Sequence, residues 1–387
     1  MKTSHTLALL IIIASIFWLV THKNTPKIKP SGKTIKIGII APFTGANKNM
    51  GEAGIKGIKI AQQLIPYLDN GNAVEWVYED DQNTPELSIT ALKTLTEGNK
   101  VDAILLLSES DSALALAKIA EQYKTPILAV FASHPDLTKY SSLLNQFNFD
   151  DTFQATVAAF YVRDELLIDR VAVVAQSDNA HFTYLANEFS KQFNSTEGEI
   201  TDRYDLPENH QDYLEMLQSI KAKDPELLYL PVSTGHLFEI KSAMTELDWN
   251  PKIMVSDGIL ASLKAQNKYQ LDMMDGMLAI DAFSHDMEFT SLGEQLLEQS
   301  ISMQISTQEI GTNSILAMEA YVFLMHVMNQ CLEQKNKRLC INKAIRSTIR
   351  FEGVKGLISF TKDGKAHRSL SINKINDQIT EFLVRVY

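Results

Sequence analysis

Residues 34–45 read TIKIGIIAPFTG, and this segment decides how the chain folds. Its nearly continuous apolar residues predict a strand that is buried on both faces. The turn that ends in Gly45 leads into a region where apolar residues return at helical spacing, at positions 55, 58, 61 and 65. A strand followed by an amphipathic helix is the repeating unit of α/β proteins that contain parallel sheets.

The residues before this strand predict export. An apolar run at 6–20 follows a weakly positive start and precedes a polar spacer, which suits a signal peptide better than a membrane span. However, no small-residue cleavage site follows the run. We therefore expect residues 1–33 to be a signal peptide or a membrane anchor plus spacer. Cleavage gives a periplasmic or extracytoplasmic domain, and retention gives the same domain anchored to the inner membrane by residues 6–20.

Composition narrows the function classes. The chain has 387 residues and a formal net charge of −11, and an acidic surface argues against nucleic acid as a partner. About 360 residues remain without the leader, which is more than one hydrophobic core usually organises, so two domains are expected. The sequence contains no HExxH, GxSxG or CxxC motif, and its nine histidines show no metal-ligand spacing. We therefore expect no enzyme, no cofactor and no metal.

Two sets of strand–helix units follow each other along the chain. They predict the fold class α/β, with two doubly wound parallel-sheet lobes. Strands of the first set are expected at 34–40, 74–78, 103–107 and 127–131, and strands of the second set at 171–175, 227–230, 253–255 and 277–282. The chain then ends in a β region, with strands expected at 357–361, 370–375 and 379–386.

Polar residues follow the predicted strands where each strand ends. In open α/β sheets this carboxyl edge is where ligands bind. Serines around Ser110 open a helix, and hydroxyls with free amides at a helix N-terminus suit a carboxylate. Plain helix capping is the alternative interpretation, and for Asp257 the alternative is a turn residue before a glycine. The candidate positions at these edges are Ser110, Ala132, Ser133, His181, Thr234, His236 and Asp257.

The chain has two cysteines, Cys331 and Cys340. They flank a short polar segment that is typical of a loop between two helices. In an oxidising compartment this separation permits a disulfide, and that is our prediction. The alternative is a pair of unpaired helix cysteines.

Taken in order, the motifs resemble the leucine/isoleucine/valine-binding protein family, which are type I periplasmic solute-binding proteins of ABC importers. The resemblance runs from about residue 34 to the C-terminus. It rests on IKIGIIAPFTGANKNMG at 35–51, WVYEDDQNTPELSITALKTL at 76–95, VDAILLLSESDSALALAKIAEQYKTPILAVFASHPDLT at 101–138, RVAVVAQSD at 170–178, MVSDGIL at 254–260 and FEGVKGLISFTKDGKA at 351–366.

The resemblance implies two lobes that close on a hinge around a small solute. We expect lobe I to hold 34–149 and 284–350, and lobe II to hold 150–283 and 351–387, with crossovers near 142–151, 280–286 and 348–355. Ser110 stands where the family binds an α-carboxylate. Ala132 and Ser133 stand where a backbone carbonyl and a hydroxyl hold the ligand, and Asp257 stands where an acid receives the α-ammonium.

This sequence departs from the family at the expected walls of the site. Met50 stands where the family has an aromatic residue, His181 aligns with a tyrosine–glycine pair, and Thr234 and His236 replace an aromatic-rich segment. The resemblance implies an amino acid or a related polar solute as ligand, an inner-membrane ABC permease as partner, and a monomer. The alternative function is an exported or membrane-anchored ligand-sensing module of the same fold.

Overall fold

The computed structural model of the chain describes residues 28–207, 209–262, 266–376 and 379–387. The predicted apolar run at 6–20 lies outside the described residues, as does most of the predicted leader. Within the described part of the chain, no helix combines the length and the apolar character that crossing a membrane requires.

The first set of units forms a five-stranded parallel sheet with the order β2-β1-β3-β4-β5. Strand β5 was not predicted, because its three residues are too few to show a pattern. The helices α2 (Lys48–Leu64), α3 (Pro85–Lys93), α4 (Ser110–Ala117) and α5 (Ala120–Tyr123) connect these strands. The strands are β1 (Thr34–Ala41), β2 (Ala73–Asp80), β3 (Ala103–Leu106), β4 (Ile127–Ala129) and β5 (Leu144–Gln146).

The second sheet has seven strands in the order β15-β14-β10-β9-β8-β6-β7. Its last two strands run antiparallel to their neighbours, so the sheet is mixed. Strand β7 was missed because it is a half-exposed edge strand with few apolar residues. The strands are β6 (Arg170–Ala175), β7 (Glu199–Asp205), β8 (Leu227–Leu230), β9 (Lys252–Val255), β10 (Leu278–Asp281), β14 (Leu370–Asn376) and β15 (Ile379–Val386).

The helices of the second lobe begin with α6, which precedes β6. Its N-cap residue Asp150 accepts a hydrogen bond from the amide of Thr152. Asn179 caps α7 in the same way. These helices are α6 (Asp151–Phe160), α7 (Ala180–Ser195), α8 (His210–Ala222), α9 (Thr234–Glu246), α10 (Ile259–Ser262) and α11 (Lys268–Met273).

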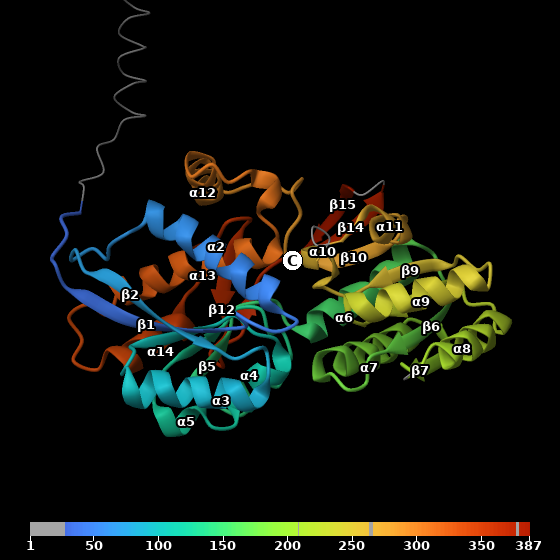
Figure 1. Cartoon of the computed structure of the whole chain (residues 1–387), viewed down its shortest axis with the longest axis horizontal. Coiled ribbons are helices and arrows are strands. Elements are labelled where there is room, and N and C mark those ends of the chain that lie inside the picture. Colours follow the sequence, from blue (N-terminus) through green and yellow to red (C-terminus); the bar gives the residue numbers. More distant parts are fainter. Residues whose placement is uncertain (1–27, 208, 263–265, 377–378) are drawn as a thin grey trace, which may run out of the picture.

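After β10 the chain returns to the first sheet. Here α12 (Ser291–Ser302), α13 (Thr312–Asn329) and α14 (Lys337–Ser347) pack, with α13 lying against α2 (Figure 1). The two helices approach closely at Gly57, because a Cβ atom there would lie 2.0 Å from the carbonyl oxygen of Ser314. Cys331 and Cys340 form a disulfide between the end of α13 and α14, with their Cα atoms 5.8 Å apart.

A small third sheet of β11 (Phe351–Glu352), β12 (Leu357–Phe360) and β13 (Ala366–His367) also lies against the first lobe. The ring of Phe360 stacks on Phe323 of α13, with ring centroids 5.0 Å apart. The chain rejoins the second sheet at Leu370, which differs from the expected return at residue 351. The chain therefore crosses between the lobes near 147–150, 282–290 and 368–369.

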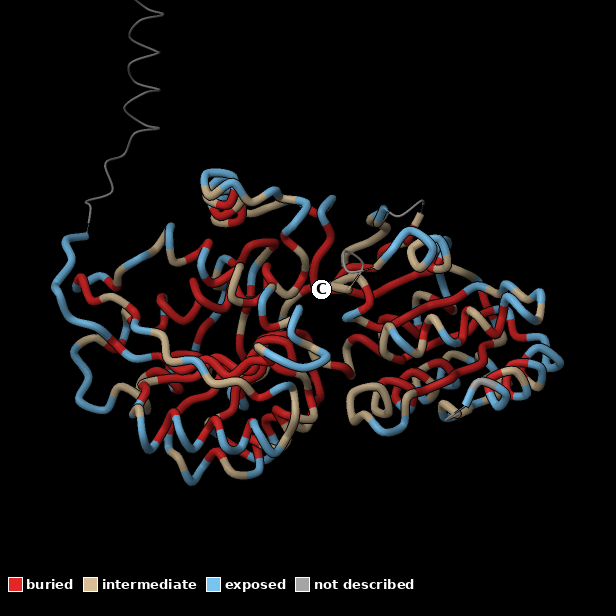
Figure 2. The backbone as a smooth tube through the Cα atoms, viewed as in Figure 1, coloured by how far each residue is buried: buried red, intermediate tan, exposed pale blue. Residues whose placement is uncertain are grey.

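Burial follows the two sheets. Strands β3, β8 and β10 are buried along their whole length, as expected for strands that are covered by helices on both faces. Figure 2 shows these strands as buried segments inside each lobe, with exposed residues on the outer helix faces. The strand ends that carry polar residues therefore sit on a rigid framework.

Candidate functional site

The two lobes touch where the carboxyl ends of their parallel strands meet. From the first lobe come the residues after β3 and β4, and from the second lobe comes the first turn of α7. The amide of Ala180 donates a hydrogen bond to Asp111 Oδ1 over 3.3 Å. Ser133 Oγ lies 3.3 Å from His181 Nδ1. These contacts bring polar residues of both lobes into one cluster.

On the first lobe, Ser110 opens α4 and is buried. Its Oγ accepts hydrogen bonds from the backbone amides of Ser133, at 3.2 Å, and of His134, at 3.3 Å. A hydroxyl oxygen that accepts two amides still carries its own O–H donor. The sequence analysis placed Ser110 and Ser133 at the same sheet edge, and the structure joins them directly.

On the second lobe, His181 lies between two carboxylates. Its Nδ1 is 2.8 Å from Asp151 Oδ2, and its Nε2 is 3.2 Å from Asp257 Oδ1. Burial opposes protonation of the ring, but the charges of Asp151 and Asp257 outweigh it and raise the pKa of His181 well above its ordinary value. Burial raises the pKa of Asp151, and the neighbouring imidazole opposes that rise.

Asp257 is held in place by Gln154 on α6. The side-chain amide of Gln154 donates to Asp257 Oδ1 over 2.9 Å, and its carbonyl oxygen accepts from the Asp257 backbone amide, also over 2.9 Å. Gly258 follows with a positive φ of 87°, which lets the chain turn sharply after the carboxylate. Gln154 therefore holds both the carboxylate and the backbone amide of Asp257 in place.

Further carboxylates surround this cluster. Asn83 donates a hydrogen bond to Glu109 Oε2 over 2.8 Å, and burial raises the pKa of Glu109. Burial also raises the pKa of Asp281, at the end of β10, to about 7. Asp151 and Asp257 both contact His181, the one cation of this cluster among the described residues, so two ionised carboxylates outnumber one imidazolium and the balance of this triad is negative.

Among the described residues, one group has metal-like spacing: the donor atoms of Asp151, His181 and Asp257 lie within 4.8 Å of one another. His181, however, faces the two carboxylates with different ring nitrogens. The three donors therefore do not point to a common centre, as a coordinated ion requires. The arrangement is an ion-paired histidine.

The remaining sequence-predicted residues have other partners. Thr234 Oγ1 lies 2.9 Å from Ser262 Oγ, and His236 Nδ1 lies 3.0 Å from the hydroxyl of Tyr213. Met50 is half-buried on α2, and Ala132 is buried after β4. Sequence reasoning did not select Asp151 and Gln154, although both lie in the first turn of a helix that opens the second lobe.

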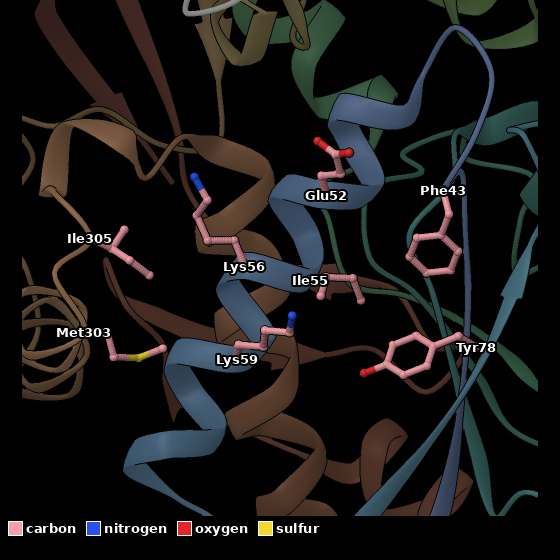
Figure 3. Close-up of a pocket in the computed structure, with 8 residues that line it drawn as sticks. All are labelled: Phe43, Glu52, Ile55, Lys56, Lys59, Tyr78, Met303 and Ile305. Atoms are coloured by element: carbon pink, nitrogen blue, oxygen red, sulfur yellow. The ribbon is translucent and has the colours of Figure 1, made fainter.

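A separate hollow of about 620 Å³ lies on the first lobe. Figure 3 shows Glu52, Ile55, Lys56 and Lys59 of α2 between Phe43 and Tyr78 on one side and Met303 and Ile305 on the other. No residue of the interlobe cluster lines it. Its lining residues are Phe43, Glu52, Ile55, Lys56, Lys59, Tyr78, Met303 and Ile305.

Comparison with known proteins matches residues 34–378 to the family model described as periplasmic binding protein. An amino acid binding protein of Pseudomonas aeruginosa is 22% identical over 298 residues, which cover 75% of this chain and 76% of that protein. The structure superposes on a leucine-binding protein of Thermotoga maritima with a TM-score of 0.81 and 22% identity, covering 91% and 98% of the two chains. It also superposes on an ABC transporter solute-binding protein of Rhodopseudomonas palustris in complex with p-hydroxybenzoic acid, with a TM-score of 0.79, 18% identity and coverage of 92% and 97%.

The chain therefore belongs to the periplasmic binding protein family. The predicted family and the two-lobed α/β fold are confirmed. This family consists of solute-binding proteins, and the membership of this chain in it places the domain outside the cytoplasm. The role of this chain is thus to bind a solute.

Proposed function

We propose that this protein is the solute-binding component of an ABC importer and that it traps a small amino acid between its lobes. The observation that carries the proposal is the meeting of two opposite poles. Ser110 and the start of α4 come from the first lobe, and Asp257 comes from the second. Ser133 contacts Ser110, and His181 contacts Asp257. Ser133 and His181 contact each other at the lobe boundary.

The first pole suits the carboxylate of an amino acid. The O–H of Ser110 and the amides at the start of α4 are donors, and the positive end of the helix dipole favours an anion. Ser110 is tied to the amides of residues 133 and 134, so the donor is held in a fixed position. Pre-positioned donors reduce the entropy that binding costs.

The second pole suits the ammonium group. Asp257 is partly accessible, with 14% of its side chain exposed, and it lies among carboxylates with one histidine as counter-charge. A negative balance of this kind favours a ligand that carries a cationic group over a purely anionic acid. The same arrangement therefore favours a zwitterion over an aromatic carboxylic acid such as the one bound by the Rhodopseudomonas protein.

Three crossing segments near 147–150, 282–290 and 368–369 give the lobes a hinge, and closure on the solute is the state that a permease senses. The partner in this proposal is an inner-membrane ABC permease, and the protein acts as a monomer. The relatives named as amino acid and leucine-binding proteins support the ligand class. The predicted leader, with its run at 6–20, either is removed or anchors the domain at that membrane.

A thermal-shift panel tests the proposal. It contains the twenty L-amino acids, benzoate, 4-hydroxybenzoate and 4-methylpentanoate, which is leucine without its amino group. We expect at least one amino acid to stabilise the protein by about 4 kcal/mol at about 1,000 times its dissociation constant. The deaminated analogue of that amino acid should give no shift. A panel in which benzoates stabilise the protein and amino acids do not would contradict the proposed ligand class.

A further inference from the structure

His181 occupies the place that the proposed function gives to the ligand's ammonium group. Its ring contacts Asp257 Oδ1 at 3.2 Å and Ser133 Oγ at 3.3 Å. These are the carboxylate and the hydroxyl that the family resemblance assigns to the ligand. One side chain of the protein thus contacts both of these groups.

The geometry defines the charge of this side chain. Asp151 and Asp257 each approach a different ring nitrogen, at 2.8 and 3.2 Å. Where both carboxylates are ionised they can only accept hydrogen bonds, and each ring nitrogen then carries a proton. His181 is therefore an imidazolium that carries the same positive charge as an ammonium group, and 14% of its side chain is exposed.

Two charged groups next to the ring favour this state. The raised pKa of His181 has Asp151 and Asp257 as its favourable causes, against the cost of burial. Other titratable groups interact with the ring or with its two carboxylates. They are Glu109 before α4, His134 after β4, Tyr184 on α7, Tyr229 on β8 and Asp281 at the end of β10.

We propose that the His181 imidazolium is an internal counter-ion of Asp257, that the ammonium group of the solute replaces it, and that solute capture therefore releases a proton. This inference rests on the proposed function, because it requires a ligand that carries an ammonium group. The apo protein then keeps Asp257 paired until the ligand arrives. An unpaired carboxylate between the lobes would be costly to bury, and an imidazolium avoids that cost.

The release of a proton follows from the exchange of the imidazolium for the ammonium group at Asp257. Before binding, the imidazolium pairs with Asp257. After binding, the ammonium pairs with Asp257, and His181 keeps Asp151 but now stands beside a second cation. The positive charge of the ammonium group lowers the pKa of the ring toward its ordinary value of about 6.5, so the ring gives its proton to the buffer. Between about pH 6.5 and the raised pKa of the ring in the ligand-free protein, affinity should therefore rise with pH, by up to about tenfold per pH unit.

Calorimetry tests this exchange. The probe is the L-amino acid with the largest shift in the panel, titrated at pH 7 in phosphate and in Tris, whose ionisation enthalpies differ. We expect the two apparent enthalpies to differ in proportion to the proton that is released, up to the full difference between the ionisation enthalpies of the two buffers. Equal enthalpies in both buffers, together with a dissociation constant that does not change between pH 6.5 and pH 8, would overturn the inference.

Two variants separate the role of His181 from general effects. His181→Asn keeps a donor at the Nδ1 position toward Asp151 but leaves Asp257 unpaired and adds no charge. It should bind the amino acid more tightly than the wild type at pH 6.5, with no proton release, and this advantage should shrink as the pH rises. His326→Asn, on the exposed end of α13, is the matched control and should keep the wild-type proton release. Loss of binding in His181→Asn with an intact fold would show that His181 holds the solute directly.

A measurement without ligand keeps the two proposals distinguishable. Nitrogen NMR of the ligand-free full chain at pH 7 should show both ring nitrogens of His181 protonated, and a neutral tautomer would overturn the inference by itself. If His181 is an imidazolium but no amino acid binds, the proposed function fails. If an amino acid binds without releasing a proton, only the exchange mechanism fails.

Discussion

A buried ion pair between Glu319 and Arg368 connects helix α13 to the crossing segment 368–369. Glu319 Oε2 on α13 lies 2.8 Å from Arg368 Nη2, and the two side chains are 2% and 6% exposed. The other oxygen of Glu319 accepts a hydrogen bond from the amide of Val354. Arg368 also donates to the carbonyl of Phe147 over 3.4 Å. We predict that Glu319→Gln destabilises the protein strongly.

The magnitude follows from what the substitution leaves behind. Glutamine keeps an oxygen for Val354 but removes the charge that balances Arg368. The guanidinium then retains one long carbonyl bond and the ring of Phe147, 5.4 Å away. Removing one partner of a buried ion pair costs about 3–5 kcal/mol. Because the hydrogen bond from the Val354 amide is retained, we expect a loss of about 3 kcal/mol. Adding Arg368→Met should recover at least about 1 kcal/mol, because the unpaired charge is gone.

Urea unfolding followed by tryptophan fluorescence measures this loss. Trp76 packs against Tyr321 of α13, with ring centroids 5.7 Å apart, so its emission reports on that helix. The control is Glu309→Gln, which removes an exposed ion pair with Lys56 at 3.7 Å and should change the free energy of unfolding by less than about 0.5 kcal/mol. A loss below about 1 kcal/mol in Glu319→Gln, with no coupling to Arg368→Met, would refute the reasoning.

Two further predictions concern the first lobe and the hinge. Reduction of the Cys331–Cys340 disulfide should cost roughly 2–3 kcal/mol, because the bridge closes a loop of ten residues, and thiol titration of the unreduced, denatured protein should find no free thiol. Burial lowers the pKa of Lys355 to about 7, below that of the unfolded chain, so the unfolded state binds the extra proton and stability should rise from pH 7 to pH 9 by up to about 1.4 kcal/mol per unit. In Lys355→Met this rise should disappear, whereas equal pH profiles for variant and wild type would count against it.

Much of the fold could be predicted because parallel strands that are buried on both faces have a plain sequence signal. Strands β3 and β8 are continuous apolar runs and β1 is nearly one, and all three were predicted. The signal fails for short or exposed strands. Strand β5 has three residues, and β7, at the edge of the sheet, has four charged residues and no buried position.

The site was predictable in its framework but not in its contacts. Strand ends led to Ser110, Ser133 and Asp257, because the carboxyl edges of parallel strands gather polar residues. The contacts of His181 with Asp151 and Asp257 depend on how three elements far apart in sequence pack together. Sequence alone treated His181 as a wall residue where the family has a tyrosine–glycine pair, and its charge became evident only from the two carboxylates on its ring.

The central claim is that Asp257 receives the ammonium group of a trapped amino acid. Calorimetry of wild type and Asp257→Ala, with the amino acid identified by the panel, tests it most directly. We expect Asp257→Ala to weaken binding by roughly 2–5 kcal/mol, because the ammonium is left without its counter-charge. Asp257→Asn should lose somewhat less, since one acceptor remains. Unchanged affinity in Asp257→Ala, with an intact fold and an amine-bearing solute, would contradict the account.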